Sequence, residues 1–147
     1  MKWSCKAFKD LSLDEFHDII QLREIVFVVE QDCPYLDVDG KDKDALHVFG
    51  KYEGNIVATT RILKPGISYD EVAIGRVVTS PTLRGMGMGK QLMEESMKFV
   101  KLHFGKVPVR ISAQTYLLRY YKSFGFIETG EEYLEDNIPH FEMLYKP

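Results

Sequence analysis

The stretch VVTSPTLRGMGMGKQLMEES, residues Val77 to Ser96, decides the fold because it joins a β-branched run to a helical pattern through three glycines. Gly85, Gly87 and Gly89 stand at alternate positions between the two patterns. Glycine has no Cβ, so it adopts positive φ without steric cost and lets the backbone approach a ligand closely. The turn is therefore a candidate ligand site.

Two common phosphate-binding motifs do not fit this turn. A Walker loop would need glycine in place of Arg84 and Ser or Thr in place of Gln91. The fingerprint G-x-G-x-x-G would need glycine in place of Lys90 or Leu92. What remains is R-x-x-G-x-G at the start of a helix, where free N–H groups and the helix dipole favour an anion. The alternative is that the glycines serve the tight geometry of the turn alone.

Composition and charge limit the class of protein. The chain has 147 residues, of which 45% are hydrophobic and 12% aromatic, enough for one core. A formal net charge of −3 gives no basic surface for nucleic acid. There is no run of about 18 apolar residues and no signal peptide, and Cys5 and Cys33 make no disulfide framework. We therefore expect one cytoplasmic domain over residues 1–147, with no nucleic-acid or membrane partner.

Alternation and helical periodicity predict the order β-α-β-β-β-α-β-α-β-β. Ser12 and Glu15 have the spacing of a capping box, so a helix should begin at about Leu13. Its expected apolar face contains Leu13, Phe16, Ile20 and Phe27. A second helix should run from Gly87 to a stop at Gly105, with a short helix over 115–124. Six of these seven strands are expected over 3–8, 45–53, 55–64, 71–80, 107–113 and 140–146, with a hairpin turn at 53–55. This mixture of hairpins and crossovers predicts an α/β protein with a mixed sheet flanked by helices.

Two landmarks together resemble the GNAT superfamily of N-acetyltransferases. The order V-V-x-S-P-x-x-R-G-x-G-x-G is similar to the acetyl-CoA signature of that family. LRYYKSFGF, residues 118–126, resembles its second landmark, with Tyr121 at the position of the usual tyrosine. LREIVFVVEQDCPYLDVDG, TTRILK, IGRVVTSP and SFGFIETGEEYLEDNIPHFEM extend the resemblance to the ElaA-like branch over nearly the whole chain.

The resemblance implies a single-domain GNAT fold whose mostly antiparallel sheet splays at its central strands, and acetyl-CoA as the donor. It implies direct attack of an amine on the thioester, with a strand N–H, that of Val78, at the oxyanion. Tyr121 would protonate the thiolate, with Tyr120 as a competing candidate. The residues implied to hold the donor are Val77, Val78, Thr79, Arg84, Gly85, Met86, Gly87, Met88, Gly89, Lys90 and Gln114.

The amine acceptor is less defined by the sequence than the donor. The preferred general base is His140, because the resemblance places its strand near the acceptor cleft, while Glu30 and Glu71 remain alternatives. Asp37 and Asp39 belong either to a solvated loop or to the acceptor entrance. The other histidines, His17, His47 and His103, have no metal-ligand spacing, so no metal is expected.

Two classes of function remain open at this point. The first is an acetyl-CoA-dependent N-acetyltransferase acting on a primary amine of a small molecule or peptide. The second is a non-catalytic acyl-CoA-binding sensor or interaction module, which would not need the hydroxyl of Tyr121. Any homodimer would form through surfaces that the sequence does not identify.

Overall fold

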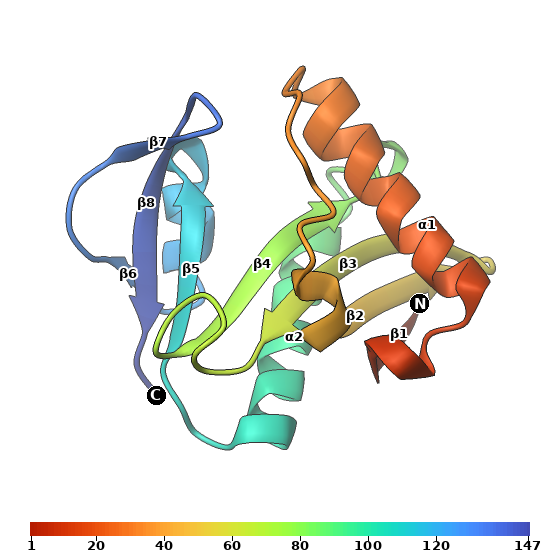
Figure 1. Cartoon of the computed structure of the whole chain (residues 1–147), viewed down its shortest axis with the longest axis horizontal. Coiled ribbons are helices and arrows are strands. Elements are labelled where there is room, and N and C mark those ends of the chain that lie inside the picture. Colours follow the sequence, from red (N-terminus) through yellow and green to blue (C-terminus); the bar gives the residue numbers. More distant parts are fainter.

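A single eight-stranded sheet runs through the computed structural model, which describes residues 1–147 (Figure 1). The strands pair in the order β1-β2-β3-β4-β5-β8-β6, and the short β7 pairs with β8. Every pairing is antiparallel except that of β4 with β5. The strands are β1 (Lys2–Ala7), β2 (Ala45–Tyr52), β3 (Asn55–Leu63), β4 (Val72–Thr79), β5 (Val109–Gln114), β6 (Phe126–Glu128), β7 (Tyr133–Glu135) and β8 (Ile138–Tyr145).

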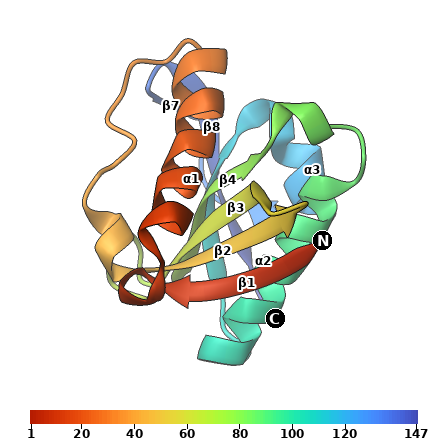
Figure 2. The same cartoon turned by 90° about the vertical axis from the view of Figure 1, so that its right-hand side faces the viewer.

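Helices cover both faces of this sheet, as the expected α/β architecture requires (Figures 1 and 2). The long helices α1 (Leu13–Arg23) and α2 (Met88–Phe104) lie on opposite faces, and both contact β3 and β4. A short α3 (Leu118–Lys122) packs on β5 and β6. Four 3₁₀ turns complete the chain, at Phe8–Asp10, Lys41–Asp44, Pro81–Leu83 and Thr115–Leu117. None of the helices is both long enough and apolar enough to cross a membrane.

The helix α1 begins as predicted but buries a different face. The Ser12 side chain accepts from the Glu15 N–H at 3.0 Å, and the Glu15 carboxylate accepts from the Ser12 N–H at 2.9 Å, which completes the capping box. The expected apolar face was wrong, because Leu13 is 91% exposed while Ile19 and Leu22 are buried. After Arg23 the helix continues as a π-helical segment, Glu24–Glu30, which alters the helical phase that a 3.6-residue period assumes.

The glycine turn between β4 and α2 has the predicted geometry. Gly85 and Gly87 have φ of +81° and +74°, and Gly87 is the N-cap of α2. The helix then buries Leu92, Met93 and Val100 in the main core below the sheet. It ends at Phe104, where the Gly105 N–H donates to the Lys101 carbonyl at 2.9 Å. The start and the stop of this helix are therefore as the sequence predicted.

A bulge in β4 separates the two central strands. Thr59 pairs with Val78 and Arg61 with Gly75, so Arg76 and Val77 face the single residue Thr60 of β3. Arg76 has a φ of +52°, which is uncommon for a residue with a side chain. A bulge bends its strand and increases the local twist. Beyond this point β4 no longer pairs with β5, since their parallel pairing is confined to Val72–Ala73 with 109–110. The expected splay of the central strands is confirmed.

Candidate active site

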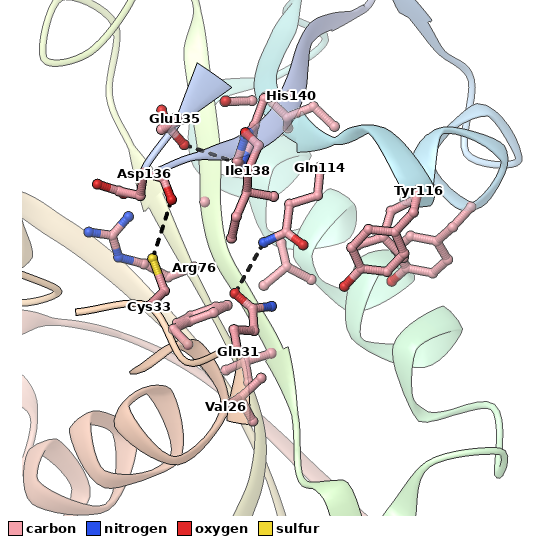
Figure 3. Close-up of a pocket in the computed structure, with 18 of the residues that line it drawn as sticks. Val26, Gln31, Cys33, Arg76, Gln114, Tyr116, Glu135, Asp136, Ile138 and His140 are labelled. Atoms are coloured by element: carbon pink, nitrogen blue, oxygen red, sulfur yellow. Dashed lines mark hydrogen bonds and ion pairs between the residues drawn. The ribbon is translucent and has the colours of Figure 1, made fainter. Parts of the chain in front are cut away.

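The gap between β4 and β5 opens into a cavity with a volume of about 470 Å³. One side is formed by β4 and the glycine turn, and the other by β5 and the hairpin of β7 and β8. The end of the π-helical segment closes a third side (Figure 3). Of the residues predicted for a site, those that line it are Glu30, Val77, Val78, Thr79, Arg84, Gly89, Gln114, Tyr120, Tyr121 and His140.

The β4 backbone presents unpaired groups to this cavity. The Ser80 N–H donates to the Val57 carbonyl of β3 at 2.7 Å, in the same register that pairs Val78 with Thr59. Backbone groups alternate in direction along a strand, so the Val78 N–H points to β3 and those of Val77 and Thr79 point toward the cavity. An extended ligand lying beside β4 would therefore meet Val77 and Thr79 rather than Val78.

The other residues predicted to hold the donor at the turn do not line the cavity; they are Gly85, Met86, Gly87, Met88 and Lys90. A Cβ built on Gly85 or Gly87 would meet no protein atom within 4 Å, so the space over the turn is open. Met86 is exposed, and the Lys90 side chain extends toward Glu94 on the helix surface. The Met88 side chain is buried in the core, which leaves only its backbone for a ligand. The turn thus offers backbone groups more than side chains.

Two tyrosines of α3 border the cavity, and their hydroxyls are placed differently. The Tyr120 hydroxyl donates to the Gly89 carbonyl at 2.6 Å, and a Cβ on Gly89 would lie 3.3 Å from that hydroxyl. The Tyr121 side chain is 6% exposed, and its hydroxyl has no hydrogen-bond partner in the protein. Burial raises the pKa of Tyr121 above its ordinary value, so its hydroxyl keeps its proton at neutral pH.

A pair of glutamines and an ion pair cross the cavity. The Gln114 side chain at the end of β5 donates to Gln31 Oε1 at 3.3 Å, as Figure 3 shows. Arg84 of the glycine turn lies 2.6 Å from a carboxylate oxygen of Glu30, with both side chains about half exposed. Glu30 ends the π-helical segment and Gln31 follows it directly. The end of this segment therefore contacts both β5, through Gln114, and the glycine turn, through Arg84.

His140 lies in the opposite half of the cavity, at the end where β7 and β8 meet. Its Nδ1 lies 2.6 Å from the Ile138 carbonyl, which only accepts, so Nδ1 carries a proton and Nε2 is free to take one. Glu135 Oε2 lies 3.4 Å from this Nε2 (Figure 3), and the Tyr133 ring stacks on the imidazole. The side chain is 6% exposed, so these contacts fix its orientation.

The hairpin that carries Glu135 was not predicted from the sequence. Asp136 and Asn137 have φ of +51° and +62°, the pattern of a two-residue hairpin turn. The dipeptide Asp-Asn, followed by an apolar run, is the signal that could have identified the strand Tyr133–Glu135 before it. Glu135 and Asp136 are consequently residues of the cavity that were not among the expected site residues.

Other predicted acceptor residues are engaged elsewhere. Glu71 accepts two hydrogen bonds from Arg110, at 2.8 and 3.0 Å, and does not line the cavity. Asp37 and Asp39 bind arginines and do not stand free at an acceptor entrance. Arg76, which does line the cavity, lies 2.8 Å from Asp37 and 3.3 Å from Asp39. Of the three candidate bases, only His140 and Glu30 remain in the cavity.

Comparison with known proteins agrees with this geometry. Residues 14–147 match the model of the acetyltransferase (GNAT) domain. Protein ElaA of Escherichia coli (strain K12) is 42% identical over 145 residues, which cover 97% of this chain and 95% of ElaA. The crystal structure of Escherichia coli ElaA has a TM-score of 0.91 at 41% identity, covering 99% of this chain and 100% of that one.

A second crystal structure, of an acyl-CoA N-acyltransferase from Pseudomonas aeruginosa, is equally similar. Its TM-score is 0.92 at 43% identity, and the match covers 99% of both chains. A GNAT family acetyltransferase from Elizabethkingia anophelis with acetyl-CoA bound shares the fold, with a TM-score of 0.71 at 13% identity, covering 99% of this chain and 97% of that one. The splayed sheet, the glycine turn and these matches lead to one conclusion: the chain belongs to the GNAT acetyltransferase family.

Proposed function

We propose that this protein transfers the acetyl group of acetyl-CoA directly to a primary amine of a small molecule or peptide. The observation that carries the proposal is the unpaired edge of β4, which runs through the cavity and ends at the glycine turn. An extended ligand with an anionic end fits such an edge, because backbone groups pair with its arm and the turn receives its phosphates.

The residues of the turn fit a pyrophosphate. The positive φ of Gly85 and Gly87 exposes consecutive backbone N–H groups, and no side chain covers them. The first N–H groups of α2 add to this set, since they lack partners within the helix. Arg84 supplies a guanidinium that would exchange Glu30 for a phosphate oxygen. Gln114 would contact the pantetheine arm.

The donor supplies a thioester, and two groups of this chain act on it. Val77 lies farther from the glycine turn than Thr79, so its N–H is the donor placed to stabilise the oxyanion, in place of the Val78 N–H expected from the sequence. The Tyr121 hydroxyl protonates the leaving thiolate, because it is buried, protonated and without another partner. Tyr120 instead holds the Gly89 carbonyl.

His140 removes a proton from the acceptor. A primary amine is protonated at neutral pH, and Nε2 of His140 is the basic nitrogen that faces the cavity. The amine nitrogen then forms a C–N bond with the acyl carbon as the C–S bond breaks. The ammonium group loses two protons in total. One is matched by the proton that the thiolate gains, and the other leaves to solvent.

Calorimetry of acetyl-CoA binding tests the donor site. Gly87→Trp fills the space over the turn, and we expect binding to be lost. Gly66→Trp is the matched control, because Gly66 also has a positive φ of +92° and an open Cβ direction but lies in the loop before β4, whereas the glycine turn follows that strand. Equal binding by wild type and both variants would show that the donor does not use the glycine turn.

A pair of tyrosine variants separates the enzyme from a non-catalytic acyl-CoA sensor. We expect Tyr121→Phe to lower kcat about 100-fold or more while acetyl-CoA still binds. Tyr120→Phe removes a hydroxyl with a structural partner and should change kcat far less. Thiol release with a panel of amines is the readout. A wild type that binds acetyl-CoA but acetylates no amine would favour the sensor.

A further inference from the structure

The half of the cavity that faces His140 carries an excess of carboxylate. The charged side chains that line the whole cavity, apart from His140, are Glu30, Arg76, Arg84, Glu135 and Asp136. Arg84 is paired with Glu30 at 2.6 Å. Arg76 is paired with two aspartates that lie behind the cavity wall. Both arginines are therefore neutralised by partners of their own.

Two carboxylates remain, and both lie on the hairpin of β7 and β8 (Figure 3). Glu135 contacts only His140, at 3.4 Å from Nε2, and is half exposed. The carboxylate of Asp136 makes no ion pair or hydrogen bond, while its backbone carbonyl accepts from the Cys33 thiol at 3.5 Å. The tight turn at Asp136–Asn137 fixes the backbone of this hairpin, whose residues Glu135 and Asp136 line the cavity.

A second observation, independent of the two carboxylates, points to a ligand in this cavity. Tyr121 lines the same cavity, and its side chain is 6% exposed and has no hydrogen-bond partner. His140, also 6% exposed, presents its basic Nε2 to the space beside Glu135. A buried acid, a buried base and two carboxylates without an arginine or lysine partner thus line one cavity.

We infer that the acceptor is an amine that carries a second positive charge, and that Asp136 selects it. This inference rests on the proposed acetyl transfer. Glu135 holds the reacting ammonium group of the acceptor beside Nε2 of His140, and this nitrogen takes a proton from the ammonium group. Asp136 attracts the second cationic group of the acceptor. The same two carboxylates repel an acceptor that carries a carboxylate of its own, so free amino acids are poor acceptors.

Three acceptors of matched length test the inference in the wild-type protein with acetyl-CoA. They are 1,5-diaminopentane, pentylamine and 5-aminopentanoate, whose far ends are cationic, apolar and anionic. We expect kcat/KM to fall in that order, by about tenfold at each step, which is the effect of a single charge–charge interaction of about 1.4 kcal/mol. Similar kcat/KM for all three would overturn the inference and leave the proposed function standing. Acetylation of none would overturn both.

A matched pair of variants assigns the preference to its residue. Asp136→Asn removes the charge at a positive φ that asparagine adopts readily, so the turn is kept. We expect it to reduce the diamine-to-pentylamine ratio of kcat/KM about tenfold. Glu131→Gln makes the same charge change nearby, outside the cavity, and should leave the ratio unchanged. A ratio that Asp136→Asn does not move would overturn the role of this residue.

Discussion

Arg23 offers the sharpest test of how the chain holds the loop that carries Asp37 and Asp42. Its side chain is 1% exposed and donates from Nε to Asp37 Oδ2 and from Nη1 to Asp42 Oδ1, each at 2.8 Å. Nη2 donates to the Asp37 carbonyl at 3.0 Å and to the second oxygen of Asp42 at 3.2 Å. Arg23→Met keeps an unbranched side chain and removes all of these donors at once.

The expected loss of unfolding free energy follows from the two carboxylates that lose the guanidinium of Arg23. Asp37 and Asp42 are 8% and 2% exposed, so water does not replace the lost guanidinium. Removing one partner of a buried ion pair costs about 3–5 kcal/mol. Asp42 keeps a 3.2 Å bond from Arg61, and Asp37 keeps its pairing with Arg76. We therefore expect a loss of about 3–4 kcal/mol, equivalent to a fall in Tm of about 6–16 °C.

Urea unfolding followed by circular dichroism measures this free energy. Lys98→Met is the control, because it removes an exposed pair with Glu95 and should stay within about 0.5 kcal/mol of wild type. Adding Asp42→Asn to Arg23→Met removes one of the stranded charges and should restore part of the loss. A loss below about 1 kcal/mol, or no recovery in the double variant, would refute the idea that charge pairing holds this loop.

Three further expectations concern other parts of the molecule. Burial lowers the pKa of His47, whose Nδ1 is buried without a partner. The unfolding free energy should therefore fall as the pH drops below about 6.5. Urea titrations at pH 5 to 8 should show a flatter pH profile for His47→Gln than for the wild type. Gly50→Ala places a Cβ 2.7 Å from the Trp3 ring and should cost about 1–3 kcal/mol in urea unfolding. Glu30→Gln removes the partner of Arg84 and should tighten acetyl-CoA binding up to about fivefold in calorimetry, the equivalent of about 1 kcal/mol.

Local signals predicted the parts of the fold that local sequence controls. The capping box at Ser12, the hairpin at 53–55, the glycine turn and the stop at Gly105 all depend on residues within one or two turns of one another. The buried face of α1 did not follow from its sequence, because apolar residues occur on both sides of it. Which side is buried depends on the sheet, and the π-helical segment shifts the phase again.

Contacts between distant residues explain what the sequence could not supply. Asp37 and Asp39 looked like free carboxylates, but their partners Arg61 and Arg76 lie on neighbouring strands of the sheet. The place of Glu135 beside His140 depends on the pairing of β7 with β8. The donor half of the candidate site consists of one contiguous motif, so it could be read from the sequence. The acceptor half combines residues of the π-helical segment, of β4 and of the hairpin of β7 and β8, which lie far apart in the sequence.

The bulge in β4 that opens the cavity is held by the loop that carries Asp37 and Asp39. A positive φ at a residue with a side chain costs about 1–3 kcal/mol, and such strain persists only where the surroundings impose it. Arg76 has this φ, and its guanidinium is held by Asp37 and Asp39 and lies 5.6 Å from the Tyr35 ring. Because Arg23 holds the same Asp37, the buried ion network supports the strained bulge that separates β4 from β5. A variant that loosens this network without unfolding the chain should therefore weaken acetyl-CoA binding, although no residue of the network lies on the glycine turn.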